Sequence, residues 1–172
     1  MLLLLMSDTH GELSKVKDIL QVEHDVDQIL HCGDVGFDLM DDSKFLCVKG
    51  NHDENQNFPK TRMITILNHR ILMLHGDRFE REVLDELCKT CDVNDYVYED
   101  CINIMNQLCS QLAKENNCDM VCYGHTHYPV NKMIDGVHVL NPGSLFYNAN
   151  GGASYMVVSI DYEEVLVRLC NV

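Results

Sequence analysis

The 172-residue sequence contains no tryptophan, only three prolines and only 13 lysine and arginine residues. Because aspartate and glutamate together number 27, the formal net charge at neutral pH is −14. A surface this short of positive charge repels phosphate backbones and anionic lipids, which argues against polynucleotide and membrane-surface partners. The scarcity of proline, together with a hydrophobic fraction of 46%, also argues against a disordered chain.

Long hydrophobic runs are absent as well. The longest, Met1–Met6, is far too short to span a bilayer, and it lacks the basic flank and the small-residue cleavage site of a secretory signal. We therefore expect a cytoplasmic protein without a membrane segment. The length is typical of one domain, and no repeat or linker divides it, so residues 1–172 are predicted to form a single domain.

Cysteine, in contrast, is abundant. Nine is an odd number, so complete internal pairing is impossible, and a chain without a secretory signal is expected in a reducing compartment. Cys88 and Cys91 have the spacing of a metal-binding pair, but no second such pair completes a zinc ribbon, and the segment is predicted to be helical. We interpret most of the cysteines as thiols packed among apolar side chains.

Short apolar segments and amphipathic segments alternate along the chain. Strands are predicted at residues 2–6, 29–32, 45–48, 63–67, 70–74, 120–123, 130–134, 137–140, 153–160 and 165–170. Helical periodicity occurs at residues 14–22 and, rich in charge, at residues 79–117, where we expect two helices broken near residues 91–94. Strands first alternate with helices and later follow one another as hairpins. This order predicts an α/β fold in which helices flank one central mixed sheet or two packed sheets.

Five of the predicted strands run into loops that begin with histidine, aspartate or asparagine. The loops carry the segments Asp8-x-His10, Gly33-Asp34, Gly50-Asn51-His52-Asp53, His75-Gly76 and Gly124-His125-Thr126-His127. Because ligands bind beyond the carboxyl ends of the strands in α/β sheets, these loops are expected to converge on one crevice. The glycines beside the polar residues allow the backbone to turn sharply and to approach a ligand closely.

The side chains in these loops suit metal ions. Seven of them offer oxygen or nitrogen atoms that bind Mn²⁺, Zn²⁺, Fe or Mg²⁺: Asp8, His10, Asp34, Asn51, His75, His125 and His127. Seven donors are too many for one closed tetrahedral zinc site, but they suffice for two ions that share a carboxylate. Two such ions can share a hydroxide and hold phosphoryl oxygens during in-line attack. His52 could protonate the leaving oxygen, or it could be a structural histidine that supports the metal loop.

These motifs, in this order, resemble the signature of the calcineurin-like metallophosphoesterases, and the length resembles their small bacterial and archaeal branch, which hydrolyses phosphodiesters. The resemblance extends over residues 1 to about 160. It implies a four-layer α/β/β/α sandwich, in which two packed mixed sheets are flanked by helices. The ligands that it implies for one ion are Asp8, His10, Asp34 and His127. Those for the other ion are Asp34 as the bridge, Asn51, His75 and His125. In the same pattern His52 lies beside the leaving group and Asp53 orients His52.

The function implied by the resemblance is that of a metal-dependent phosphoesterase, in particular a phosphodiesterase, in which a metal-bridging hydroxide attacks a small phosphate ester. Two divalent ions per chain are expected, with manganese favoured over zinc, nickel, iron and magnesium. Two alternatives stay open: a phosphomonoesterase with the same metal site, and a binding scaffold that kept the fold and lost catalysis, as the retromer subunit resembling this family did. The intact ligand set favours catalysis, because a scaffold would be free to lose ligands.

Two features depart from the family pattern. His75 is followed by Gly76 and Asp77, where many relatives carry a further histidine, so the rim that faces the substrate is expected to differ. The helical stretch at residues 79–117 is longer than the compact members need. We interpret this stretch as an enlarged outer helical layer; the alternative is a cap, or a contact in a homo-oligomer, that narrows the access of the substrate.

Overall fold

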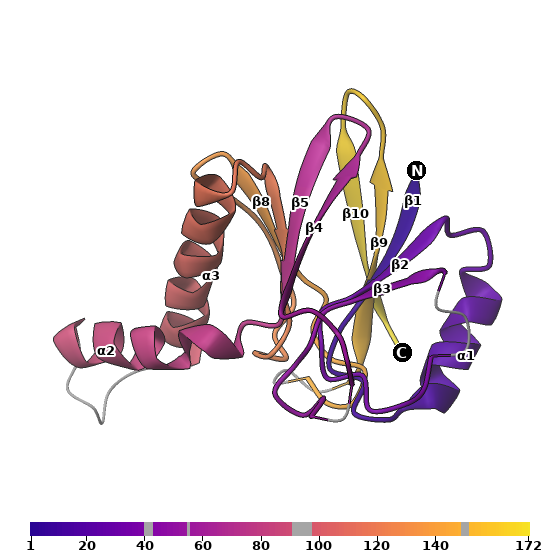
Figure 1. The fold of residues 1–172 in the computed structure, drawn as a ribbon, viewed down its shortest axis with the longest axis horizontal. Coiled ribbons are helices and arrows are strands. Elements are labelled where there is room, and N and C mark those ends of the chain that lie inside the picture. The colour runs from indigo at the N-terminus through magenta and orange to yellow at the C-terminus, as the bar shows by residue number, and fades with distance from the viewer. Residues whose placement is uncertain (40–42, 55, 91–97, 149–151) are drawn as a thin grey trace.

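The structure, a computed structural model, describes residues 1–172 except residues 40–42, 55, 91–97 and 149–151. The strands are β1 (Leu2–Met6), β2 (Gln28–His31), β3 (Phe45–Cys47), β4 (Thr61–Ile66), β5 (His69–Leu74), β6 (Met120–Cys122), β7 (Val130–Ile134), β8 (Val137–Asn141), β9 (Ser154–Ile160) and β10 (Val165–Asn171). The helices are α1 (Leu13–Val22), the short 3₁₀ helix η1 (Asp77–Phe79), α2 (Glu80–Thr90) and α3 (Tyr98–Glu115). Figure 1 shows two sheets face to face, with α1 outside one sheet and α3 outside the other.

The two sheets follow similar plans. In the first, the strand order is β10-β9-β1-β2-β3; β1, β2 and β3 are parallel, and β9 runs antiparallel to both of its neighbours. In the second, the order is β4-β5-β6-β8-β7; β5, β6 and β8 are parallel, and the edge strands β4 and β7 are antiparallel to their neighbours. The carboxyl ends of the parallel strands therefore lie together at one edge of each sheet.

Apolar clusters fill the three spaces between the layers. Because successive side chains of a strand point to opposite faces, Leu5 of β1 is buried between the two sheets, whereas Leu4 faces outward. Leu4 shares a cluster with Val16 of α1, and on the far side Val121 of β6 shares one with Met105 of α3. The layer order is thus helix, sheet, sheet, helix, which confirms the predicted four-layer α/β/β/α sandwich.

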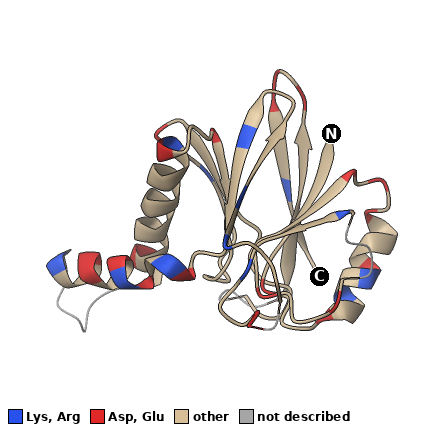
Figure 2. Cartoon of the chain, in the orientation of Figure 1, with Lys and Arg blue, Asp and Glu red and all other residues tan. Residues whose placement is uncertain are grey.

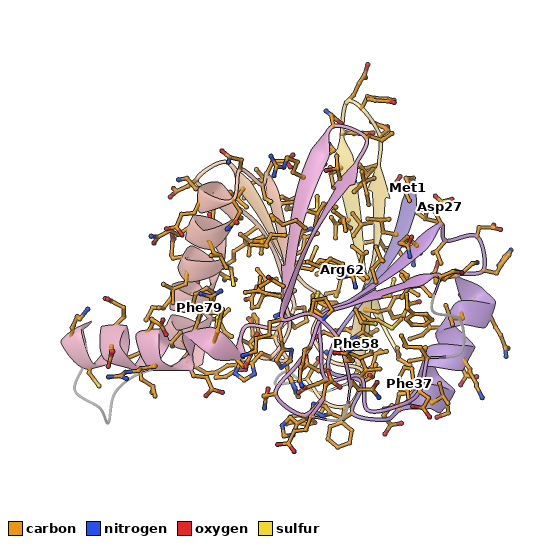
Figure 3. All side chains as sticks on the ribbon, in the orientation of Figure 1. Met1, Asp27, Phe37, Phe58, Arg62 and Phe79 are labelled. Carbon is orange, nitrogen blue, oxygen red and sulfur yellow. The ribbon has the colours of Figure 1, made fainter. Side chains whose placement is uncertain are left out.

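The two helices of the long helical stretch have different roles. The charged residues of α3 are confined to its two ends, whereas those of α2 are distributed along the helix (Figure 2). Accordingly α3 buries Ile102 and Met105 on the second sheet, and α2 projects away from the sandwich (Figure 1). Phe79 is buried in the same cluster where α2 leaves the sheets (Figure 3). The predicted break near residues 91–94 lies outside the described residues. Among the described helices, none combines the length and the apolar character needed to cross a membrane.

Polar contacts fix the ends of several strands. The amino group of Met1 donates to the carbonyl oxygen of Ile160 at 2.7 Å, and the next backbone N–H donates to Asp27 Oδ2 at 2.7 Å (Figure 3). Across the sandwich, Arg62 Nε of β4 donates to the carbonyl oxygen of Cys47 of β3 at 3.4 Å. This last contact joins the two sheets close to the loop that follows β3.

The structure describes eight of the nine cysteines, and none of these eight forms a disulfide. Cys109 and Cys122 are fully buried, and burial raises the pKa of Cys122 to about 12 and that of Cys109 further. Such thiols stay protonated at neutral pH and pack as small apolar groups, in agreement with the prediction. Cys88 is exposed, and Cys91, its partner in the suspected metal pair, lies outside the described residues.

Candidate metal centre

Every predicted metal ligand follows one of the parallel strands. Asp8 and His10 follow β1, Asp34 follows β2, Asn51 follows β3, His75 follows β5, and His125 and His127 follow β6. The loops of the two sheets meet at one end of the sandwich (Figure 1). Backbone hydrogen bonds join neighbouring loops there, because the Asp8 N–H donates to Gly33 at 3.0 Å and the Gly124 N–H donates to His75 at 2.9 Å. The five loops therefore lie at one end of the sandwich, and the assignment of their side chains as metal ligands stays a prediction.

Two buried carboxylates form the middle of this site. The side chains of Asp8 and Asp34 are 0% and 3% exposed, and their oxygens lie with His75 Nε2 within 4.8 Å of one another. Asp8 forms a second such group with His10 and His127, in which Asp8 Oδ1 lies 3.1 Å from His127 Nε2. In the described part of the chain, neither carboxylate has a lysine or arginine partner.

Asp34 lies between histidines that were predicted to bind different ions. Its Oδ2 atom is 3.4 Å from His75 Nε2 and 3.7 Å from His10 Nε2. The other carboxylate oxygen, Oδ1, accepts a hydrogen bond from the backbone N–H of His52 at 2.8 Å. One oxygen is thus fixed by the backbone, and the other faces the space between the histidines. This placement suits a carboxylate that bridges two ions.

The ring of His75 is held in one tautomer. Its Nδ1 atom is 2.8 Å from the carbonyl oxygen of Cys32, and a carbonyl oxygen can only accept, so Nδ1 carries hydrogen. Its Nε2 atom therefore faces the site, where Asn51 Oδ1 lies 3.0 Å away. In the neutral ring this nitrogen has a free lone pair, and a backbone carbonyl behind the ring is a common orienting partner of a metal-bound histidine.

The carboxylates shift the pKa values of the histidines around them. Burial alone would lower the pKa of His75, but the Asp34 and Asp8 carboxylates outweigh burial and raise it to about 9. Burial would raise the pKa of Asp34, but the hydrogen bond and the charge of His75 lower it to about 2. Burial and then the charge of His75 lower the pKa of His125. The raised pKa favours the imidazolium form of His75 in the metal-free protein, and binding of an ion through Nε2 would leave the neutral ring with its hydrogen on Nδ1.

Asp53 is a positioning residue for the loops that follow β2 and β3. Its carboxylate accepts hydrogen bonds from the backbone N–H groups of Asp34 at 2.7 Å, Val35 at 2.9 Å and Gly50 at 3.0 Å. Within the described contacts, no hydrogen bond joins this carboxylate to the ring of His52. The hydrogen bonds of Asp53 thus fix the backbone of the loops that follow β2 and β3, and its role in orienting His52 stays a prediction.

The ring of His52 lies at the exposed side of the centre. It is exposed to solvent, and its centroid is 5.2 Å from that of His10, at an interplanar angle of 70°. Because the backbone N–H of the same residue is bound to Asp34, the position of the ring is tied to the centre. A group bound at the carboxylates could therefore be reached by this imidazole from the solvent side.

The backbone is strained at the ligands themselves. Five of the seven predicted ligands have positive φ angles: Asp8 (52°), His10 (43°), Asp34 (57°), His125 (68°) and His127 (52°). The left-handed conformation costs a residue other than glycine about 1–2 kcal/mol, and such residues persist where the surrounding structure holds them. Their concentration here indicates that the fold maintains this arrangement for a function.

Two glycines allow the loops to approach the carboxylates. A β-carbon on Gly50 would lie 2.0 Å from Asp34 Oδ1, and one on Gly124 would lie 2.7 Å from Asp8 Oδ2 and 1.9 Å from Ser7 Oγ. Distances this short exclude any side chain at either position. The glycines that the sequence places beside the polar residues are therefore required by the space around the ligands.

Three further residues contact the site, although none of them is among the predicted ligands. Glu80, the first residue of α2, places Oε1 3.0 Å from His125 Nε2. Asn141 Nδ2 donates to the carbonyl oxygen of Gly124 at 2.9 Å, and Ser144 Oγ donates to that of Asp8 at 2.9 Å. By itself the sequence Asn141-Pro142-Gly143-Ser144 indicates only a turn. Nothing in the charged sequence of α2 distinguishes Glu80 from its neighbours.

The donor set as a whole fits divalent cations. All donors are carboxylate, amide or imidazole groups, which suit first-row divalent ions, and no thiol is among the described residues of the centre. Among the described residues, histidines are the only cationic partners of these two buried carboxylates, and a divalent ion would supply the charge that such a pair lacks.

Comparison with known proteins assigns the family. The sequence matches the model of the calcineurin-like phosphoesterase superfamily domain over residues 1–163. The chain belongs to this superfamily. A probable metallophosphoesterase of Bacillus subtilis is 25% identical over 169 residues, which cover 96% of this chain and 88% of the relative. A phosphodiesterase of Methanocaldococcus jannaschii is 24% identical over 148 residues, which cover 81% of each protein.

Solved structures share the fold of this superfamily member. A predicted phosphoesterase from Streptococcus pneumoniae matches with a TM-score of 0.77 and 23% identity, over 99% of this chain and 88% of that one. A single mutant of Vps29 from Entamoeba histolytica matches with a TM-score of 0.64 and 20% identity, over 100% and 99% of the two chains. At these identities the structural likeness concerns the sandwich alone.

The position of Asp34 between the two groups of histidines leads to a test of the ligand assignment. Asp34→Ala should remove the shared ligand and weaken the binding of both ions. Asn51→Ala should weaken the binding of mainly one ion. Metal content per folded chain, measured by elemental analysis after gel filtration, distinguishes the variants, and circular dichroism verifies folding. Asp135→Ala, in the exposed turn before β8, serves as the control and should keep two ions. Two tightly held ions in Asp34→Ala would contradict the bridging role.

The raised pKa of His75 predicts that metal binding releases a proton. A metal ion needs the neutral ring, so below a pH of about 9 the ion competes with a proton for Nε2. Because the competing proton is lost as the pH rises, the apparent metal affinity should rise with pH. The rise should be up to about tenfold per pH unit and should level off above the pKa of His75. Calorimetry in buffers of different ionisation enthalpy measures the protons released. His75→Gln should release about one proton fewer than the unmodified protein, and equal release by both would refute the assignment.

Proposed function

We propose that this chain is a phosphodiesterase that uses two divalent metal ions, with manganese as the favoured metal, to hydrolyse small phosphate esters. The observation that carries the proposal is the pair of buried carboxylates, Asp8 and Asp34, surrounded by imidazoles from both sheets and by no lysine or arginine in the described structure. Membership of a phosphoesterase superfamily supports the same conclusion.

Different residues of the site would bind the two ions and donate the proton. Asp8, His10, Asp34 and His127 would hold one ion, and Asp34, Asn51, His75 and His125 would hold the other. When bound, such ions supply the positive charge that neutralises the phosphoryl oxygens and lowers the pKa of the attacking water. The amide of Asn51 contributes a ligand without negative charge, which limits repulsion of an anionic substrate. The imidazole of His52, which lies beside His10 at the exposed side of the centre, would give a proton to the departing oxygen.

The charge of the protein supports a diester as the substrate. A phosphodiester carries one negative charge at neutral pH, whereas a monoester carries close to two. The chain has a net charge of −14, and the Glu80 carboxylate stands at the edge of the site next to His125. These charges oppose a dianion more than a monoanion. The likeness to a protein named as a phosphodiesterase is consistent with this choice.

Activity of the reconstituted protein tests the proposal. Protein stripped of metal with a chelator should be inactive, and added Mn²⁺ should restore hydrolysis of bis(p-nitrophenyl) phosphate more strongly than Zn²⁺, Ni²⁺ or Mg²⁺. The diester should be turned over with a higher kcat/KM than p-nitrophenyl phosphate. A reversed ratio would identify a phosphomonoesterase. Failure of every metal to restore hydrolysis of either ester, in protein that binds two ions, would instead favour a binding scaffold.

The proposed proton transfer by His52 predicts a dependence on the leaving group. An alkoxide needs a proton in order to depart, whereas a nitrophenolate departs with little help. His52→Ala should therefore slow the hydrolysis of alkyl esters by about 10²–10⁴-fold and that of nitrophenyl esters much less, with both ions still bound. Rates over a series of leaving groups measure this difference, and His24→Ala, at an exposed position, is the control.

Two other outcomes would withdraw the proton-donor role. A loss of metal together with equal slowing of all esters would show that His52 supports the metal loop through Asn51. Equal slowing with full metal content would show that the ring stabilises charge on the phosphoryl group.

A further inference from the structure

A hollow leads away from the centre on the side of His125 and His127. One cavity of about 540 Å³ is lined by these two histidines together with Tyr98, Thr126 and Tyr147. A second cavity, of about 310 Å³, shares Tyr98, His125 and Thr126 with the first and continues between α2 and α3. The proposed metal ligands and the space between the two helices are therefore parts of one continuous surface.

The walls of the second cavity, which we call the α2–α3 groove, are apolar. Apart from the shared residues and Glu80, its lining consists of Val83, Leu84, Cys101, Ile102 and Met105. Leu84 is 55% exposed, although large apolar side chains at a free surface lose the benefit of burial. The groove thus offers apolar surface to a ligand directly beside the centre.

Aromatic rings stand at the mouth of the groove. The hydroxyl of Tyr98 donates to the carbonyl oxygen of Thr126, and its ring packs edge-on against Tyr128 at a centroid distance of 6.2 Å. These contacts hold the ring in place while it remains 47% exposed. Tyr147 is also exposed and lines the adjoining cavity. Fixed and exposed aromatic rings are suited to stacking against a planar group.

The opposite side of the centre has a different character. A cavity of about 610 Å³ beside Asn51 and His75 is lined by the basic residues Lys49, Lys60 and Arg78 as well as by acidic ones. Of these two cavities, the α2–α3 groove has the more apolar lining and is therefore the more favourable place for an apolar substituent. There the Glu80 carboxylate, 62% exposed, repels a second anionic group.

We propose that the α2–α3 groove binds an uncharged aromatic group of the substrate, namely the ester group that stays on phosphorus during hydrolysis. This inference rests on the proposed phosphodiesterase function. The retained group is assigned to the groove because His52, placed to protonate the leaving oxygen, does not line the groove or the cavity that joins it to the centre. The long helical stretch then takes part in substrate selection as well as in covering the second sheet.

Two diesters with the same leaving group test the proposal. Methyl p-nitrophenyl phosphate and phenyl p-nitrophenyl phosphate differ only in the retained group, so their chemistry at the leaving oxygen is alike. With metal-loaded protein, the KM of the phenyl ester should be roughly tenfold lower at similar kcat, because the phenyl ring buries apolar surface in the groove. Equal KM values for the two esters would overturn the proposal.

Variants of the groove locate the effect. Leu84→Ser and Tyr98→Ala should both raise the KM of the phenyl ester several-fold relative to that of the methyl ester. Leu166→Ser changes the same residue type at a similar exposure of 57% on β10, and should alter neither value. If Leu84→Ser and Tyr98→Ala left the preference for phenyl intact, the groove would not be the binding site.

A binding measurement separates this inference from the proposed function. Calorimetry with metal-loaded protein should show phenylphosphonate binding roughly tenfold more tightly than methylphosphonate, and Leu84→Ser should remove the difference. If neither diester is hydrolysed but phenylphosphonate still binds more tightly, the proposed phosphodiesterase function is refuted and the assignment of the groove as an aromatic binding site is supported. If the two phosphonates bind equally to the unmodified protein, the groove assignment fails, whatever the activity.

Discussion

The arrangement of this protein depends on holding the carboxylates of Asp8 and Asp34 together, away from water. Two like charges within 4.8 Å of a common imidazole repel each other strongly at low dielectric constant, and each has lost its hydration. His75 and His127 compensate part of this cost, as their raised pKa values show. The part of the negative charge that these histidines do not compensate would attract divalent cations to the site.

The fold brings these side chains together by directing parallel strands of both sheets toward one edge. Each loop supplies only one or two of the predicted donors, so loops from both sheets have to meet at this edge. Hydrogen bonds from side chains to the backbone hold these loops in place. The carboxylate of Asp53 accepts from the backbone N–H groups that follow β2 and β3, and the hydroxyl of Ser144 donates to the carbonyl oxygen of Asp8. The strain at the ligands is thereby balanced by hydrogen bonds that have no part in the chemistry.

The sequence was most informative where chemistry and local structure coincide. A buried strand that ends in a short segment with glycine and a donor residue predicts a ligand loop, and the structure brings all five of these loops together. Strand order could not be predicted in this way, since the pairing of β1 with β9 joins residues about 150 positions apart and depends on no local pattern. The sequence did not predict Glu80 and Tyr98 as site residues for a related reason. Their contacts depend on where α2 and α3 lie relative to the sheets, and helical periodicity does not predict the position of a helix in the fold.

Because the centre lies between two sheets, the core between the sheets influences the distances between the predicted metal ligands. Ligands from β1 and β2 belong to one sheet and those from β5 and β6 to the other, so the packing between the sheets sets their separation. Three methionines, Met73, Met120 and Met156, are buried in that layer, and this flexible side chain adapts to irregular space. Metal–ligand distances vary by only about 0.2 Å, far less than the width of a methyl group. The volume of the inter-sheet core would therefore help to determine which cation radius the proposed metal centre accepts, through residues that do not themselves touch an ion.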